Sequence, residues 1–280
     1  MSRPRLPGAG GDRSLVTSSR NPRVAAARRT GKRSFREQDR RFLAEGPQAV
    51  REALSWRPDV VESVLVTDEF ANRHPELLAA AEVAAADVVR VAGDVLAELA
   101  GTVTPQGIVA VCGFLDVPVA TALAERPRLV AVLSNVRDPG NAGTVLRAAD
   151  AAGADAVVLS DASVDAYNGK AVRASAGSLF HLPVVLAARL VETADAARGA
   201  GLRVVAADGS GRSIDIAERE GRLAEPTAWV FGNEAWGLAR ETLELCDDVL
   251  AVPIHGHAES LNLATAAAVC LYASARAQRA

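Results

Sequence analysis

The chain has 280 residues, of which 49% are apolar and only 4% aromatic, and its formal net charge is −3. This length suits two domains whose cores are built mainly from Ala, Val and Leu. The sequence contains no run of about 18 uncharged apolar residues and no apolar stretch behind the N-terminal arginines, which argues against a transmembrane helix and a secretory signal.

The three cysteines indicate the compartment in which the protein works. Cys112, Cys246 and Cys270 are widely spaced and show no metal-type pairing. Such residues are typical of buried thiols in a reducing compartment, so we expect a cytoplasmic protein without a metal site.

The charge is unevenly distributed along the chain. Residues 1–57 hold 14 Lys and Arg against 5 Asp and Glu, so the remainder is acidic. A solvated basic tail and a contact surface for a polyanion both account for this excess. We favour nucleic-acid contact because the cations continue beyond the tail into a patterned segment: Arg28, Arg29, Lys32, Arg33, Arg36, Arg40 and Arg41.

The first part of the chain alternates between strand-like and helix-like segments. Residues 1–12 are rich in Gly, Pro and Arg and are predicted to be a disordered basic tail. Asn21-Pro22 is a good helix start. Beyond it we predict strands at 42–46, 60–66, 88–91 and 107–111 and helices at 47–56, 75–86 and 94–100. Residues 13–115 are therefore expected to form a compact α/β domain.

A proline-containing linker, 116–128, separates this domain from a second α/β domain, 129–280. The second domain is expected to have strands at 129–133, 156–159, 182–186, 203–207, 228–231 and 249–252, and helices at 142–152 and from 261 to about 276. Its strands are continuous apolar runs, as expected for a parallel sheet covered on both faces.

The segment 135–147 is the first that carries chemistry. A strand ends at Ser134, Pro139-Gly140 forms a turn, and Asn141 is expected at the N-cap of the next helix. Arg147 lies nearly two helical turns further on, near the same face. Asn141 and Arg147 are either a cap and a surface cation, or a pair suited to a phosphate group.

The segment 231–238 follows a second buried strand. Gly232 would allow a ligand to approach the backbone. Glu234 either offsets the dipole of a nearby helix or belongs to a ligand site.

The segment 252–263 leads into the last helix, with Ser260 as a plausible N-cap. Ligands of α/β proteins bind beyond the carboxyl ends of parallel strands, so 231–238 and 252–263 are expected to share one pocket. His255 and His257 lack the further ligands of a zinc site. The Gly-x-Ser-x-Gly, Gly-x-Gly-x-x-Gly and Gly-x-x-x-x-Gly-Lys-Ser/Thr motifs of hydrolases, dinucleotide-binding enzymes and kinases are missing.

A fourth segment, 170–178, is basic and rich in small residues. We expect a loop there that either connects two elements or lines an anionic groove.

Three of these segments, taken in order, resemble the motifs of the SpoU/TrmH family of RNA 2′-O-ribose methyltransferases in the SPOUT superfamily. They are Asn-x-Arg-Asp-Pro-Gly-Asn-x-Gly-x-x-x-Arg at 135–147, Phe-Gly-Asn-Glu-x-x-Gly-Leu at 231–238 and Pro-Ile-x-Gly-x-x-x-Ser-Leu-Asn at 253–262. The Arg-Ala-Ser-x-Gly at 173–177 is similar to the family as well. Residues 36–110 resemble its N-terminal substrate-binding domain, which is related to a ribosomal-protein RNA-binding fold.

The resemblance implies a C-terminal domain with a deep trefoil knot, a homodimer, and S-adenosylmethionine held by the knot loops. It implies catalytic roles for Asn141, Arg147, Glu234, Ser260 and Asn262. Cofactor contacts are implied for Phe231, Gly232, Val252, Ile254, Leu261 and Leu263. With the charge pattern, it makes Arg28, Arg29, Lys32, Arg33, Arg41 and Arg173 candidates for RNA binding.

The resemblance favours large-subunit ribosomal RNA as the substrate. Transfer RNA, or an inactive relative that only binds RNA, remain alternatives, and antibiotic-resistance methylation belongs to the same family. A guanidinium is a poor base, so we expect Arg147 to anchor a phosphate and stabilise the developing alkoxide.

Overall fold

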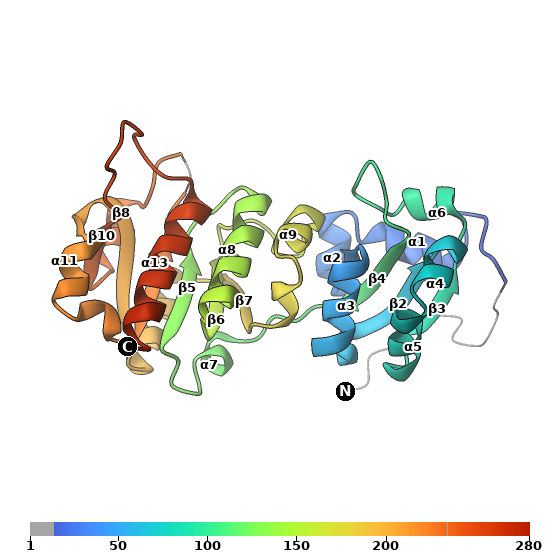
Figure 1. Ribbon diagram of the computed structural model, residues 1–280, viewed down its shortest axis with the longest axis horizontal. Helices are drawn as coiled ribbons and strands as arrows, with labels where there is room; N and C mark the ends of the chain where they lie inside the picture. The colour runs from blue at the N-terminus through green and yellow to red at the C-terminus, as the bar shows by residue number, and fades with distance from the viewer. Residues whose placement is uncertain (1–13, 234) are drawn as a thin grey trace. The chain divides into compact units, whose positions relative to one another are not determined.

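The computed structural model describes residues 14–233 and 235–280, which form two compact units (Figure 1). The first unit is the described part of Met1–Leu115 together with Tyr167–His181, and the second is Asp116–Ala166 with Leu182–Ala280. The predicted tail, 1–12, and Glu234 lie outside the described residues.

The first unit is built on a mixed four-stranded sheet with the order β1-β4-β2-β3. β1 (Arg41–Glu45) and β2 (Val61–Val66) both pair antiparallel with β4 (Ile108–Gly113), and β2 pairs parallel with β3 (Asp87–Arg90). The α/β prediction for this part of the chain is therefore confirmed.

Helices cover both faces of this sheet: α1 (Pro22–Arg29), α2 (Arg33–Asp39), α3 (Pro47–Trp56), α4 (Asp68–Arg73), α5 (Pro75–Val83) and α6 (Gly93–Ala97), with a 3-10 turn, η1 (Pro58–Val60). α1 begins where predicted, since the Asn21 side chain accepts a hydrogen bond from the Arg23 N–H. Val24 and Ala27 of α1 are buried in a core cluster with α6 and the sheet. The basic N-terminal segment is thus part of the folded unit from this helix onward.

The segment expected to be a loop at 170–178 is mostly helical, and that prediction was wrong. It forms α9 (Gly169–Ala174) and a 3-10 turn, η2 (Ser178–Phe180). The Asn168 side chain caps α9 by accepting from the Lys170 N–H, which the composition alone did not reveal. Just before it, the Tyr167 ring stacks on Phe114 at 3.9 Å and its hydroxyl accepts a 2.6 Å hydrogen bond from the Leu115 N–H.

The second unit is built on a six-stranded sheet with the order β10-β8-β9-β5-β6-β7, in which every pair is parallel. The strands are β5 (Leu129–Leu133), β6 (Ala156–Ser160), β7 (Val184–Ala188), β8 (Arg203–Ser213), β9 (Thr227–Phe231) and β10 (Asp248–Ala251). β5, β6 and β9 are buried along their whole length, as predicted from their continuous apolar sequences.

β8 is longer than the sequence suggested, and Gly211 explains how it continues. A Cβ at this position would lie 2.3 Å from the backbone oxygen of Val249, so only glycine allows β8 to run past β10 here. The pairing register also shifts at Val249.

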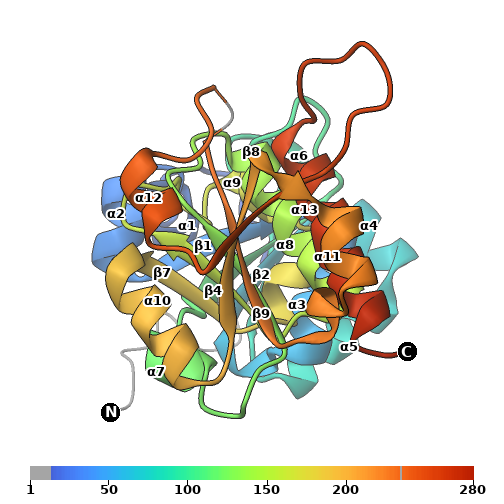
Figure 2. The ribbon, with the colours of Figure 1, turned by 90° about the vertical axis from the view of Figure 1, so that its left-hand side faces the viewer.

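Helices lie on both sides of this sheet (Figure 2). One side carries α7 (Val119–Ala122), α10 (Leu190–Gly199) and α12 (Arg240–Glu244), and the other α8 (Pro139–Ala152), α11 (Ile214–Arg219) and α13 (Leu263–Ala277). A 3-10 turn, η3 (Arg222–Ala224), follows α11. Within the segment predicted as a linker, Ala122 and Leu123 are buried in the core of this unit.

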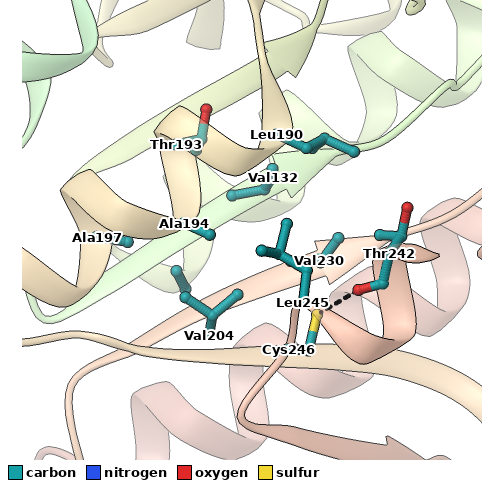
Figure 3. Close-up of a pocket in the computed structure, with 11 residues that line it drawn as sticks. Val132, Leu190, Thr193, Ala194, Ala197, Val204, Val230, Thr242, Leu245 and Cys246 are labelled. Atoms are coloured by element: carbon teal, nitrogen blue, oxygen red, sulfur yellow. Dashed lines mark hydrogen bonds between the residues drawn. The ribbon is translucent and has the colours of Figure 1, made fainter.

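A small apolar gap lies between the sheet and α10 and α12 (Figure 3). Its volume is about 10 Å³. On its wall, the Cys246 thiol donates to the Thr242 carbonyl, and burial raises the pKa of Cys246 to about 11. Burial likewise raises the pKa of Cys270 to about 12. Both thiols are therefore protonated near neutral pH, which does not suit a nucleophile.

Trp229 joins the centre of this sheet to the last helix. Its indole N–H donates a 2.9 Å hydrogen bond to the Ser274 hydroxyl of α13, and both residues are completely buried. This bond helps to hold α13 against β9.

Replacing Ser274 with Ala should lower the free energy of unfolding by about 1–3 kcal/mol, because the buried indole N–H loses its acceptor. Urea unfolding followed by tryptophan fluorescence measures the change. Thr265→Ala, at an exposed position of the same helix, is the control and should cost less than about 0.5 kcal/mol. Equal losses in the two variants would contradict a specific role for the indole bond.

Candidate functional site

Part of β8 and the segments that follow β9 and β10 border one cavity of about 300 Å³. The turns at 231–238 and 252–263 both contribute to it, as expected for the carboxyl ends of neighbouring parallel strands. Five residues predicted to contact the cofactor line it, together with Ser260: Gly232, Val252, Ile254, Leu261 and Leu263. Phe231 does not line the cavity, since its side chain is buried and stacks on Trp229.

The sequence analysis missed a third wall, formed by residues 207–209 at the point where β8 passes the cavity. The Asp208 carboxylate accepts hydrogen bonds from the backbone N–H and the hydroxyl of Ser210. The Asp-Gly-Ser-Gly sequence after the predicted strand 203–207 was the available signal, because such residues are typical of a turn. Glu259 adds a second carboxylate to the lining.

The turn after β9 is fixed by Asn233, which is 7% exposed. Its amide donates to the Asn135 carbonyl at 2.9 Å, and its side-chain oxygen accepts from the Ala235 N–H at 2.8 Å. Two backbone hydrogen bonds also join Asn233 and Gly237. Asn233 therefore connects the second sequence motif to the first.

The backbone of the turn gives a second reason for glycine at position 232. A Cβ at this position would lie 2.5 Å from the carbonyl carbon of Gly237. The returning backbone of the same turn requires glycine here, and Gly232 also lines the cavity.

Two buried serines hold the start of the first motif. Asn135 has a φ of 57°, and its N–H donates to the Ser160 hydroxyl at 3.0 Å. The Ser163 hydroxyl accepts from the Val136 N–H and donates to the Leu133 carbonyl. These hydroxyls come from β6 and the turn after it, so no pattern within 135–147 pointed to them.

The helix caps differ from those predicted at both ends of the site. Asp138, not Asn141, caps α8, because its side chain accepts from the Asn141 N–H. Asn262, not Ser260, caps α13, because its side chain accepts from the N–H groups of Ala264 and Thr265. Asp138 and Asn262 have extended backbones, as a cap requires, and Asn141 already lies within the first turn.

The Asn262 amide also donates a 3.1 Å hydrogen bond to the Asn141 side-chain oxygen. The structure thus brings together two of the predicted catalytic residues, which are 121 positions apart in the chain. Arg147 is exposed further along α8, and Ser260 is exposed on the cavity wall. Neither has a hydrogen-bond or ion-pair partner among the residues that the structure describes.

The predicted RNA-binding cations lie on the first unit, and most are paired with carboxylates. The pairs are Arg28 with Glu98 at 3.1 Å, Arg29 with Asp39 at 3.6 Å, Arg33 with Glu37 at 2.7 Å, Arg41 with Glu62 at 2.6 Å and Arg173 with Glu45 at 2.8 Å. Lys32 is exposed and has no such partner within the described part of the chain. The basic excess of the first 57 residues is therefore partly neutralised where it arises.

Two kinds of feature are absent from the described residues. No group of three or more His, Cys, Asp or Glu in 14–233 and 235–280 is arranged to hold a metal ion. No helix in the same ranges has both the length and the apolar character needed to cross a membrane.

Family comparisons agree with this geometry. Residues 128–272 match the model of the SpoU rRNA Methylase family, and residues 21–110 match the MRM3-like substrate binding domain. The chain belongs to the SpoU rRNA Methylase family. The resemblance inferred from the three motifs is thus confirmed.

Individual members of the family resemble the chain over most of its length. It is 37% identical, over 92% of its length and 97% of the relative's, to the 23S rRNA (guanosine(2553)-2′-O)-methyltransferase RlmP of Bacillus subtilis. The crystal structure of an AdoMet-bound rRNA methyltransferase from Sinorhizobium meliloti covers 94% of this chain and 97% of its own, with 29% identity and a TM-score of 0.81. The AdoMet complex of the SpoU methyltransferase AviRb from Streptomyces viridochromogenes covers 92% and 99%, with 30% identity and a TM-score of 0.77.

Two substitutions of Asn262, both of which remove its contact with Asn141, isolate its role as a cap. Asn262→Asp keeps an acceptor for the N-terminal N–H groups of α13, whereas Asn262→Ala removes it. We expect Asn262→Ala to lower the free energy of unfolding by about 0.5–2 kcal/mol and Asn262→Asp to stay within about 0.5 kcal/mol of the unchanged protein. Urea titration of both variants measures this. Equal stability of the two would show that the cap contributes nothing.

Proposed function

We propose that this protein methylates a ribose 2′-hydroxyl of large-subunit ribosomal RNA, using S-adenosylmethionine as the methyl donor. The observation that carries the proposal is the single cavity bordered by the second and third family motifs, with the first motif tied to both by Asn233 and Asn262. The relatives reported above are named as rRNA or SpoU methyltransferases, and two of their structures hold AdoMet.

The cavity suits this cofactor chemically. Its volume of about 300 Å³ is at the lower end of the range for small-molecule sites, roughly 300–1,000 Å³. Leu250, Val252 and Leu261 offer apolar contact for an adenine ring, and strand-end backbone groups offer hydrogen bonds. Asp208 and Glu259 provide negative charge, which is favourable for a sulfonium. Bound there, S-adenosylmethionine would supply an electrophilic methyl group.

The protein's own residues must position the ribose oxygen and accommodate the loss of its proton. Arg147 projects from α8 as an exposed guanidinium, and a guanidinium is too poor a base to take the proton. We propose that it binds the phosphate next to the target ribose and stabilises the developing alkoxide, while the proton leaves to that phosphate or to water. Asn141, held by Asn262, and Ser260 would orient the ribose and Arg147. Glu234 would hold the loop 231–238 or Arg147 in place.

The proposal includes a trefoil knot and a homodimer. β10 lies at one edge of the sheet, yet α13, which follows it, bonds to Trp229 of β9 and to Ala151 of α8. Residues 252–262 must therefore return across the carboxyl ends of the strands, which supports threading of this segment. Val269 and Tyr272 of α13 and Trp236 are exposed large side chains, which supports a subunit interface on this unit. Analytical ultracentrifugation would test the dimer.

Substrate binding is proposed for the first unit, which matches a substrate binding domain. Arg28, Arg29, Lys32, Arg33, Arg41 and Arg173 would contact RNA mainly through phosphates. We propose a cytoplasmic location, where a reducing environment would keep the three cysteines as free thiols.

Two measurements test the function directly. Calorimetry should show S-adenosylmethionine binding to the purified protein, and transfer of a labelled methyl group should occur to 23S rRNA but not to transfer RNA. Mass spectrometry of digested rRNA should locate the group on a ribose 2′-oxygen, with guanosine the first base to examine, given the name of RlmP. Binding without transfer to either RNA would favour an inactive relative, and methylation of transfer RNA alone would replace the substrate.

Arg147→Lys tests the role of the guanidinium. If Arg147 binds phosphate through two parallel hydrogen bonds, lysine keeps the charge but loses that geometry. We expect kcat to fall by about 10- to 100-fold, corresponding to roughly 1.4–2.7 kcal/mol, with unchanged affinity for S-adenosylmethionine. Single-turnover methyl transfer and calorimetry measure the two quantities. Arg240→Lys, on exposed α12, is the control. Near-full turnover in Arg147→Lys would rule out this positioning role.

A further inference from the structure

The first unit contains a second cavity, of about 240 Å³, that none of the three motifs borders. It lies beside β1, which is an edge strand of the sheet. Its walls come from three parts of the chain: the α1–α2 connection with α2, the loop after α6, and the start of the 167–181 segment.

Three cationic side chains, Arg36, Lys170 and Arg173, contribute to its lining, against one carboxylate, Glu45. Arg36 is 5% exposed, and its guanidinium donates to the carbonyls of Thr30 and Gly31 at 2.8 and 2.9 Å. These two carbonyl oxygens hold the guanidinium at the cavity wall. The lining therefore carries a net positive charge, which favours an anion.

Glu45 holds Arg173, the third of these cations, in place. Its carboxylate, which is 9% exposed, accepts hydrogen bonds from Arg173 at 2.8 Å, from the Gly101 N–H at 3.0 Å and from the Thr102 hydroxyl. The Arg173 guanidinium is thereby held against the loop after α6, since a Cβ on Gly101 would lie 2.9 Å from its Nη1. Arg173 is a rigid part of the wall rather than a mobile surface cation.

The remaining lining contains apolar and aromatic side chains beside the polar Thr30 and Asn168. Leu43, Leu99 and Tyr167 face the same space. Cations beside apolar surface match a nucleotide, which has a charged phosphate and a base with apolar faces. The volume is smaller than the roughly 300–1,000 Å³ of most small-molecule sites, so a duplex is excluded and the cavity would take no more than one unpaired nucleotide.

We propose that this cavity binds a single unpaired nucleotide of the substrate RNA, at a distance along the RNA from the nucleotide that is methylated. The inference rests on the proposed function, because it assigns the RNA of that reaction to a second site. Phosphate contacts alone do not distinguish RNA sequences, whereas a cavity that must admit an unpaired base selects RNA in which one is available. The cavity would therefore contribute substrate selection.

Two variants of the full chain test the proposal, one electrostatic and one steric. Lys170→Gln removes an exposed cation from the wall. Gly101→Leu adds bulk to the wall at an exposed loop position and pushes against the Arg173 guanidinium, without changing the formal charge. Each has a matched control in the first unit outside the cavity: Arg51→Gln on the exposed face of α3, and Gly93→Leu, whose Cβ would meet nothing within 4 Å.

Affinity for transcribed 23S rRNA is measured at several salt concentrations, together with KM and kcat for methyl transfer. Both cavity variants should weaken RNA binding and raise KM by about tenfold, with unchanged kcat and unchanged S-adenosylmethionine binding. Lys170→Gln should also reduce the slope of log K against log salt by about 1. The two controls should stay within twofold of the unchanged protein.

The outcomes separate the cavity from the methyltransferase proposal. An unchanged protein that binds no S-adenosylmethionine and methylates no RNA would refute the proposed function. An active protein whose cavity variants behave like their controls would refute the cavity alone. A third outcome is that free 5′-GMP binds the unchanged protein but not Gly101→Leu, while both bind RNA with the same affinity. This result would assign the cavity to a free nucleotide and also overturn the proposal.

Discussion

The site of the second unit depends on one side chain, Asn262, which makes two kinds of contact at once. Its oxygen satisfies the first N–H groups of α13, and its amide donates to Asn141 on α8. The beginnings of two helices from distant parts of the chain are therefore fixed relative to each other by a single amide. α13 is anchored again further along by the Trp229–Ser274 bond, so its start cannot shift independently of the sheet. The Asn262 contacts and the Trp229–Ser274 bond therefore help to position Arg147 on α8 and the cavity-lining residues at the start of α13.

In the turn after β9, one side chain again contacts two parts of the site. The Asn233 side chain bonds to Asn135 of the first motif and to Ala235 of its own turn, and Gly232 leaves room for the backbone that returns beside it. Three stretches of sequence that look like separate motifs are thus one hydrogen-bonded assembly. A substitution in any of them changes the geometry of the others, which is why stability and activity must be measured together at this site.

The sequence was sufficient for the parts of the fold that depend on local pattern. Continuous apolar runs predicted the buried strands β5, β6 and β9, and Asn21-Pro22 predicted the start of α1. Predictions that depended on choosing between neighbouring polar residues were less reliable. Both Asp138 and Asn141 can cap a helix, as can both Ser260 and Asn262, and only the backbone angles distinguish them. The Ser160–Ser163 pair was missed because it bonds to residues of the first motif that lie far away in the sequence. The Asp208 wall was missed because its turn-like local sequence does not show that it lies beside 231–238 and 252–263.

The number of cations in the sequence overstates the electrostatic field of the folded first unit. Fourteen cations within 57 residues suggested a strong field over the first unit. In the folded chain, carboxylates such as Glu98, Glu62 and Glu45 stand within 3.1 Å of arginine nitrogens. Opposite charges at this distance cancel beyond about one Debye length, roughly 8–10 Å at moderate salt. Long-range attraction to RNA is then weaker than the sequence implies, and recognition depends on cations that the fold holds at defined positions. Arg173 in its pair with Glu45 is such a cation, because the ion pair that reduces its field also fixes its orientation.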